Sequence, residues 1–500
     1  MRSPDASAQR SRISVLIGLT VALLVVRLWL DARLELMFDE AYYALWAKHL
    51  AWCYLDHPPL VALWIRLSTW CFGGNEFGVR ALGTLAAAAG TGVVYLLSWH
   101  LFANRAAATL AGLLYCSMLL IAAGAIIVTP DTPLVFFWSI ALYALAQIYR
   151  GNDARWWLVV GIAMGLALQS KYTALLLGAG IPCAMLTVPR MRVWWRRPEP
   201  YLAGILAFAI LLPVVIWNYR HGWASFAKQF SRADVDGLGI RYVAEFAASQ
   251  IGLLTPLVFV LAAAGCWLAL SRRGNEGRDA ELFLVSLIAP MMLYFLLHSL
   301  HARVHGNWTA PAYPVLAILG AQAAFRASEF GERMRSTIAF CRKWAVPTGV
   351  GIAAIAYLQA IAAPLPLDAA KDPTSLMVGW SLLAHEVEGV ARREGASYIL
   401  TSSYALTSEL DVYSDGAIPI LQFDEPMRWL SFERPQESLF SSPGLYVTED
   451  VRDRSDELVS RFREMRRVGE VARTRDGRLI ARYVIYLVAK PSRAVLDAAE

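Results

Sequence analysis

Long apolar segments recur along the chain from residue 13 to residue 363, and short polar or charged segments separate them. A transmembrane helix needs about 20 mostly apolar residues. Segments that approach this length lie at 13–30, 79–101, 106–127, 132–149, 156–170, 172–188, 201–217, 246–270, 280–298, 310–325 and 344–363. The pattern predicts an α-helical polytopic membrane protein with about eleven transmembrane helices.

The pattern changes after Pro364-Leu-Pro366. Residues 376–394 have helical periodicity with charged side chains on the polar face, and the spacing predicts another helix near 455–466. Short β-type runs occur at 398–400, 418–420, 444–447 and 479–488. The sequence therefore predicts a transmembrane domain over 1–365 and a small α/β domain over 366–500.

Positive charge in the loops predicts the orientation of the helices. Arg2, Arg10 and Arg12 precede the first apolar segment, which no small-residue cleavage site follows, so we expect an uncleaved first span. Cytoplasmic loops carry an excess of Lys and Arg. The Arg-rich loops alternate correctly with this N-terminus, at 105, 150–155, 190–197, 271–274 and 326–343. The loops at 31–78, 129–133, 170–172, 218–245 and 301–307 are then extracytoplasmic, as is the α/β domain.

The composition agrees with a membrane protein. The chain is 57% hydrophobic and 17% charged, and its mean hydropathy is +0.44, whereas soluble domains carry about 25% charged residues. The net charge of +6 lies largely in Arg-rich loops, so it sets topology and does not indicate nucleic acid. The six cysteines are scattered, and hydrolase, P-loop, Rossmann and H-E-x-x-H motifs are missing from the sequence.

Unusual polar residues gather in the predicted extracytoplasmic loops. The first loop contains Asp39, Glu40 and Tyr42, and Asp56-His57-Pro58-Pro59 begins seventeen residues after Asp39. Ionisable groups near a membrane are candidates for function. Asp39 or Glu40 can act as a general base or ligate a divalent cation, or can simply favour a helix start. The prolines hold His57 in a rigid turn, suited to a phosphate contact.

The next two loops add a carboxylate and a cation. Asp131 lies in Thr129-Pro-Asp-Thr-Pro133, where it is either an N-cap or a second functional carboxylate. Lys171, beside Tyr172, is the only lysine between Lys48 and Lys228. It either snorkels to the interface or contacts a phosphate.

Two later loops complete the candidate set. Arg220 ends one apolar segment, and a dense polar run contains His301, Arg303, His305, Asn307 and Trp308. This run can contact a phosphate or sugar, with Trp308 as a stacking face, or form an interfacial aromatic belt. If 301–305 were helical, the i, i+4 spacing of the two histidines could also hold a metal.

Together these motifs resemble the C-type glycosyltransferases. Asp39-Glu-Ala-x-Tyr, Asp56-His-Pro-Pro-Leu60, Thr-Pro-Asp131-Thr-Pro and Lys171-Tyr172 are similar to motifs of protein-mannosyltransferase family 39 and its bacterial relatives, including lipid A aminoarabinose transferases. The resemblance covers roughly the first 320 residues. It implies that Asp39 is the essential acidic residue of the first outer loop and Asp131 the second. Aminoarabinose transferases usually have Lys where this chain has His57.

The resemblance implies transfer of a sugar from a polyprenyl-phosphate donor to lipid A, a polysaccharide, another lipid or a protein at the periplasmic face of the bacterial inner membrane. Asp39 would deprotonate the acceptor, and a single displacement would invert the anomeric carbon. Lys171, His57 and Arg303 would stabilise the leaving phosphate. A divalent metal is permitted but not required. The alternatives are a glycolipid transporter or flippase, whose site would lie near the bilayer midplane, and a structural subunit.

Overall fold

The computed structural model describes residues 4–231, 239–271, 276–492 and 494–496. Contacts divide the chain into two compact units. Unit 1 comprises Met1–Trp29, His57–Val61 and Ala81–Ile355, and unit 2 comprises Leu30–Asp56, Ala62–Arg80 and Ala356–Glu500. The boundaries of these units differ from those of the predicted domains, 1–365 and 366–500, because unit 2 also contains two N-terminal segments. The division into these two domains therefore stays a prediction.

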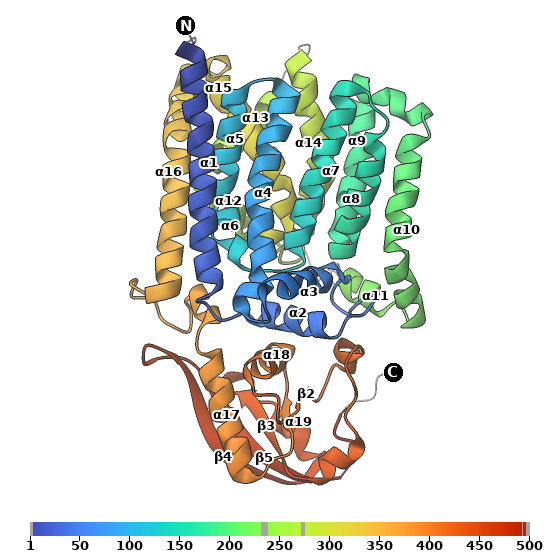
Figure 1. Cartoon of the computed structure of the whole chain (residues 1–500), viewed down its shortest axis with the longest axis vertical. Coiled ribbons are helices and arrows are strands. Elements are labelled where there is room, and N and C mark those ends of the chain that lie inside the picture. The colour runs from blue at the N-terminus through green and yellow to red at the C-terminus, as the bar shows by residue number, and fades with distance from the viewer. Residues whose placement is uncertain (1–3, 232–238, 272–275, 493, 497–500) are drawn as a thin grey trace. The chain divides into compact units, whose positions relative to one another are not determined.

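Unit 1 is helical, and its long helices run along one common direction in Figure 1. The helices that lie wholly or mainly in it are α1 (Pro4–Asp31), α4 (Glu76–Phe102), α5 (Arg105–Ser117), α6 (Leu119–Ala122), α7 (Asp131–Gly151), α8 (Trp156–Ser170), α9 (Leu175–Thr187), α10 (Glu199–Arg220), α11 (Ala224–Ser231), α12 (Ile240–Leu254), α13 (Pro256–Ser271), α14 (Glu276–His298), α15 (Tyr313–Phe325) and α16 (Glu332–Ala362).

Length and composition make six described helices candidate membrane spans: Ser11–Asp31, Glu76–Phe102, Asp131–Gly151, Glu199–Arg220, Asp279–His298 and Glu332–Ala362. The number rises to nine if each of three bent helix pairs is one span. A polytopic helical membrane protein is confirmed, whereas the predicted count of eleven is not. One reason is that Trp156–Ser170, predicted as a span, is only 15 residues long.

Local chemistry explains where one of the three bent pairs breaks. Helix α12 meets α13 at an angle of 106°. Thr255 at this junction has a positive φ of 69°, and Pro256 follows it. Pro256 has no N–H with which to continue the hydrogen-bond ladder, so the helix ends before it.

Glycines let several helices of unit 1 pack closely. A Cβ atom on Gly180 of α9 would lie 2.3 Å from the carbonyl oxygen of Leu287 in α14. A Cβ on Gly265 of α13 would lie 2.2 Å from the carbonyl oxygen of Leu319 in α15. Small residues at such crossings allow two backbones to come into direct contact, as is common in membrane bundles.

Unit 2 contains a five-stranded sheet and several helices. Its strand order is β2-β1-β3-β5-β4, in which β1 pairs in parallel with β2 and β3 and the remaining pairs are antiparallel. The elements are α2 (Phe38–Lys48), α3 (Leu60–Phe72), α17 (Trp380–Glu394), β1 (Ile399–Thr401), α18 (Tyr404–Tyr413), β2 (Ile420–Gln422), β3 (Gly444–Glu449), α19 (Ser455–Val459), β4 (Phe462–Arg475) and β5 (Arg478–Pro491).

The sheet packs against α17 and α18 through an apolar core that includes Leu383, Leu410, Ile399, Leu445 and Ile485. This confirms the predicted C-terminal α/β fold. The prediction of a helix near 455–466 is only partly correct, because α19 ends at Val459 and strand β4 begins at Phe462. The β4–β5 hairpin turns at Asp476 and Gly477, whose φ angles are 49° and 75°, and such Asp-Gly turns favour tight hairpins.

Candidate active site

One group of polar contacts in unit 2 lies at the N-terminal end of α2, where Glu40 is fully buried. Its carboxylate accepts hydrogen bonds from Arg80 at 2.6 and 2.9 Å, and the Met37 backbone N–H donates to it at 3.0 Å. Arg80 also donates to the carbonyl oxygens of Leu34 and Glu35. The side chains of this ion pair have no exposed surface. Glu40 therefore fixes the start of α2 to the preceding loop.

Asp39, the preceding residue, is only half-buried and has a different neighbour. The Tyr404 hydroxyl of α18 donates a hydrogen bond to Asp39 at 3.1 Å. Helix α18 packs directly on α2, so two segments more than 350 residues apart in the chain meet at this carboxylate. Within the described residues this is the one hydrogen bond to the Asp39 side chain, so the carboxylate retains acceptor capacity for a substrate proton.

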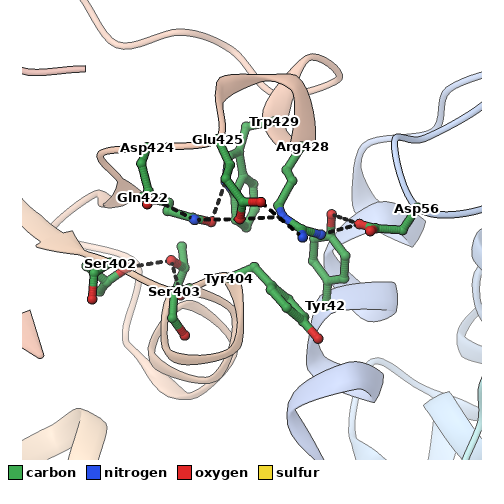
Figure 2. A network of polar contacts seen from close by, with 12 residues as sticks. Tyr42, Asp56, Ser402, Ser403, Tyr404, Gln422, Asp424, Glu425, Arg428 and Trp429 are labelled. Carbon is green, nitrogen blue, oxygen red and sulfur yellow. Dashed lines mark hydrogen bonds and ion pairs between the residues drawn. The ribbon is translucent and has the colours of Figure 1, made fainter. Parts of the chain in front are cut away.

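Asp56 lies at the centre of a second group of contacts in unit 2. Figure 2 shows the Arg428 guanidinium between the carboxylates of Asp56 and Glu425. Arg428 donates to Asp56, and it donates to Glu425 at 2.7 Å. The Tyr42 hydroxyl donates to Asp56 at 3.1 Å, and the guanidinium lies 4.6 Å from the Tyr404 ring centroid. Charge-assisted bonds of this kind hold side chains firmly in place.

These surroundings change the proton affinity of Asp39. Burial is the main cause that raises the pKa of Asp39 to about 6, and the nearby carboxylates of Asp56 and Glu40 contribute to this rise. The Tyr404 hydrogen bond and the positive charge of Arg428 act in the opposite direction. A general base is most effective when its pKa lies near the working pH. Asp39 is thus ionised at neutral pH yet basic enough to take a proton.

A separate polar cluster lies in unit 1, where Asp131, Lys171 and Asn307 meet. The Lys171 ammonium donates to the two carboxylate oxygens of Asp131 at 2.8 and 3.0 Å, and Asn307 donates to the same carboxylate at 2.6 Å. The ammonium also lies 5.9 Å from the ring centroid of Trp308. The structure therefore brings four of the predicted site residues into one cluster, in which Asp131 and Lys171 are buried and the other two are half-buried.

Helix ends position all of these groups. Asp131 is the first residue of α7, directly after Pro130, which is suited to a helix start. Lys171 follows the last residue of α8 in extended backbone geometry, with φ −160°. Asn307 belongs to the short 3₁₀ helix η4 (Gly306–Ala312). Because helix ends leave backbone groups and side chains unengaged by the helix itself, they are natural places for a polar cluster.

Other predicted residues of unit 1 have separate contacts. The Tyr172 hydroxyl hydrogen-bonds to Ser225 at 2.9 Å, whereas Arg303 forms an exposed ion pair with Glu245 at 2.9 Å. Arg220 is exposed at the end of α10, and His57 is half-buried in the bend before Pro58.

The histidine run does not form the helical pair that the sequence allowed. Residues 299–305 are turns and irregular backbone, so the i, i+4 spacing of His301 and His305 does not place them on one helix face. His305 lies near Trp308, with ring centroids 5.3 Å apart, and His301 lies near His298 at 4.8 Å. Across the described part of the chain, no group of three or more His, Cys, Asp or Glu side chains is arranged to hold a metal ion.

Sequence reasoning missed Tyr404 and Arg428 as site residues and did not assign a role to Asp56. Asp56 was detectable, because it adjoins His57 in the same motif. Tyr404 and Arg428 are ordinary residues of the C-terminal region, and no local pattern marks them. Only the packing of α18 and the short 3₁₀ helix η7 (Pro426–Trp429) against the α2 region reveals their place.

The helical membrane fold and the two polar clusters define a class of enzyme, which comparisons with known proteins identify. Residues 56–217 match the family model described as dolichyl-phosphate-mannose-protein mannosyltransferase. The fold is similar to that of ArnT from Cupriavidus metallidurans, with a TM-score of 0.62 at 18% identity over 94% of this chain and 97% of that one. That structure is bound to undecaprenyl phosphate.

Two curated relatives give the comparison more detail. The chain is 28% identical to the lipid A galacturonosyltransferase RgtD of Rhizobium johnstonii, over 80% of this chain and 82% of the relative. It is 26% identical to the undecaprenyl phosphate-α-4-amino-4-deoxy-L-arabinose arabinosyl transferase of Erwinia tasmaniensis, over 65% of this chain and 59% of that protein. The predicted resemblance is confirmed: the chain is an integral membrane glycosyltransferase of the C-type architecture.

Proposed function

We propose that this enzyme transfers a sugar from a polyprenyl-phosphate donor to lipid A at the periplasmic face of the bacterial inner membrane. The similarity to a lipid A galacturonosyltransferase over four fifths of the chain supports this acceptor. The alternation of Arg-rich loops supports a cytoplasmic N-terminus and a periplasmic C-terminal domain.

Asp39 is the general base of this reaction, and the observation that carries the assignment is its environment. It is desolvated, its pKa is raised to about 6, and it accepts one hydrogen bond from Tyr404 among the described residues. Asp39 removes the proton of the attacking hydroxyl as the acceptor oxygen bonds to the anomeric carbon. The bond from that carbon to the phosphate oxygen breaks, and the polyprenyl phosphate leaves with the electron pair. One displacement of this kind inverts the anomeric carbon.

Lys171 is the cation that stabilises the leaving phosphate. Asp131 and Asn307 hold its ammonium group, and Trp308 lies beside it. A preorganised cation stabilises developing negative charge without reorganising during the reaction. His57, Tyr172, Arg220, His301, Arg303 and His305 remain proposed donor or acceptor contacts. Tyr42 and Glu40 support the site through Asp56 and Arg80 respectively.

Mass spectrometry of lipid A tests the function. A deletion strain should lose one sugar substituent from lipid A, and the wild-type gene should restore it. Purified enzyme should add the sugar to lipid A when it is given a polyprenyl-phosphate-linked uronic acid or aminopentose, with inversion detected by NMR. A transporter would restore the modified lipid in cells but would transfer no sugar in the purified reaction, and that result would overturn the proposal.

A further inference from the structure

A cavity of about 370 Å³ lies within unit 2, next to the contacts of Asp39 and Asp56. Leu45 and His49 of the α2 region, Thr407 and Asp411 of α18, and residues of β2 and the segment 423–435 line it. Small-molecule sites have volumes of about 300–1,000 Å³ and combine apolar walls with a few polar groups. This cavity has the dimensions and the lining of such a site.

The cavity shares three elements with the site of the base. Helix α2 supplies Tyr42 to the Asp56 contacts and Leu45 to the cavity wall. Helix α18 likewise supplies Tyr404 to Asp39 and Thr407 to the wall. Three residues advance a helix by about 4.5 Å. On each helix, less than one turn therefore separates the residue that contacts Asp39 or Asp56 from the residue that lines the cavity.

The third shared element is η7, which contributes Arg428 to Asp56 and Trp429 to the cavity. The centroid of the Trp429 ring lies 5.7 Å from that of Tyr42 and 5.0 Å from that of Phe432. Figure 2 shows Trp429 beside Glu425 and Arg428. Trp429 thus lines the cavity and also contacts Tyr42, which donates to Asp56.

The lining chemistry indicates a sugar. The rings of Trp429 and Phe432 offer flat apolar surfaces, and the polar ring of His49 lies 4.3 Å from that of Phe432. Such faces can pack against the C–H face of a pyranose, while polar groups on the wall bind its hydroxyls. Asp411 provides such a group, because its half-buried carboxylate has no hydrogen-bond partner among the described residues.

We propose that this cavity binds a saccharide unit of the acceptor and so positions the acceptor hydroxyl for Asp39. The inference rests on the proposed transfer reaction. In that reaction the attacking hydroxyl of the acceptor must reach Asp39, while another sugar unit of the same acceptor can occupy the neighbouring cavity. The carboxylates of Asp411, Asp424 and Glu433 outnumber the one guanidinium of the cavity wall, that of Arg434, so the charge of the lining favours an uncharged sugar unit over the donor's phosphate.

Two variants of the full-length enzyme test the cavity. Leu430→Trp fills it, and its side chain is 38% exposed, so the fold can accept a larger group. Asp411→Asn removes the carboxylate, and burial already raises the pKa of this group, so a neutral side chain suits the position. Leu479→Trp is the matched control, because Leu479 is 42% exposed in the same unit but lies outside the cavity.

Initial rates should be measured with lipid A and the polyprenyl-phosphate sugar varied in turn. We expect each cavity variant to raise KM for lipid A about tenfold, with kcat and the donor KM within about twofold of the control, because uniform binding is lost. An unchanged lipid A KM in either variant would overturn the proposal, as would a rise in the donor KM instead. If the wild-type enzyme itself transfers no sugar, the proposed function fails. If the wild-type enzyme is active but the cavity variants keep a normal KM for lipid A, only the proposal for the cavity fails.

Discussion

The two carboxylates predicted for the site, Asp39 and Asp131, lie in different units and have opposite surroundings. Asp131 accepts hydrogen bonds from Lys171 and Asn307, so a cation and an amide compensate its charge. Asp39 has a neutral tyrosine hydroxyl as its hydrogen-bond partner, and burial raises its pKa to about 6. A compensated carboxylate is a poor base but a good anchor for a cation. Asp39 is therefore suited to proton transfer, whereas Asp131 is suited to holding the cation that contacts the phosphate.

The same contrast occurs between neighbours on α2. Glu40 is fully buried and ion-paired with Arg80, whereas Asp39, one residue earlier, is half-buried beside Tyr404. A step of one residue on a helix rotates the side chain by about 100°, so one carboxylate enters the protein interior and the other borders the site. The buried Glu40–Arg80 pair holds α2 in place, and α2 carries the proposed base, Asp39.

Replacement of the base should have the largest effect on activity. We expect Asp39→Asn to lower kcat by about 10²–10⁴-fold, the usual contribution of a general base, while the protein remains folded. Lipid A modification in a complemented deletion strain and single-turnover rates of purified enzyme measure this loss. Glu386→Gln, an exposed carboxylate on α17, is the control and should retain full activity. Activity of Asp39→Asn within about tenfold of wild type would show that another group takes the proton.

Breaking the buried pair should damage stability. Removal of one partner from a buried ion pair costs about 3–5 kcal/mol, because the remaining charge is uncompensated. Glu40→Gln and Arg80→Met should each lower the melting temperature sharply in detergent, and activity should fall only with the folded fraction. The double variant Glu40→Leu/Arg80→Met should regain much of the loss. A stable but inactive Glu40→Gln would instead assign Glu40 to the chemistry.

These two groups also show how far sequence reasoning reaches. The hydrophobic pattern predicts the helices, and the motifs mark Asp39, Asp131, Lys171 and Asn307 as candidates, because polar residues between apolar segments are conspicuous. The sequence does not separate the roles of Asp39 and Glu40, since their surroundings depend on Arg80 and on α18. Tyr404 and Arg428 stay hidden for the same reason: they reach the site through contacts between distant segments, and such contacts leave no local pattern.

The cation cluster offers a smaller and different effect. Lys171→Met should lower kcat about 10²-fold, the cost of removing one preorganised group that stabilises developing charge. Lys171→Arg should recover part of the rate, because it retains the positive charge. Asp131→Asn should cost less than Lys171→Met, since an amide can still orient the ammonium group. If Asp131→Asn abolished activity while Lys171→Met did not, Asp131 would be the base, and the comparison with Asp39 would be reversed.

The smallest expected effect concerns the hydroxyl that contacts the base. The ionised form of Asp39 is the active one, so kcat/KM should fall as the pH drops below about 6. The Tyr404 hydrogen bond stabilises that ionised form and lowers the pKa. Tyr404→Phe should therefore raise the pKa of Asp39 and move the acidic limb of the pH–rate profile to higher pH, with near-normal rates at alkaline pH. Tyr398→Phe is the control, because the buried Tyr398 hydroxyl has no hydrogen-bond partner among the described residues. A profile that shifts equally in both variants, or not at all in Tyr404→Phe, would mean that Tyr404 does not tune the base and that burial alone sets its pKa.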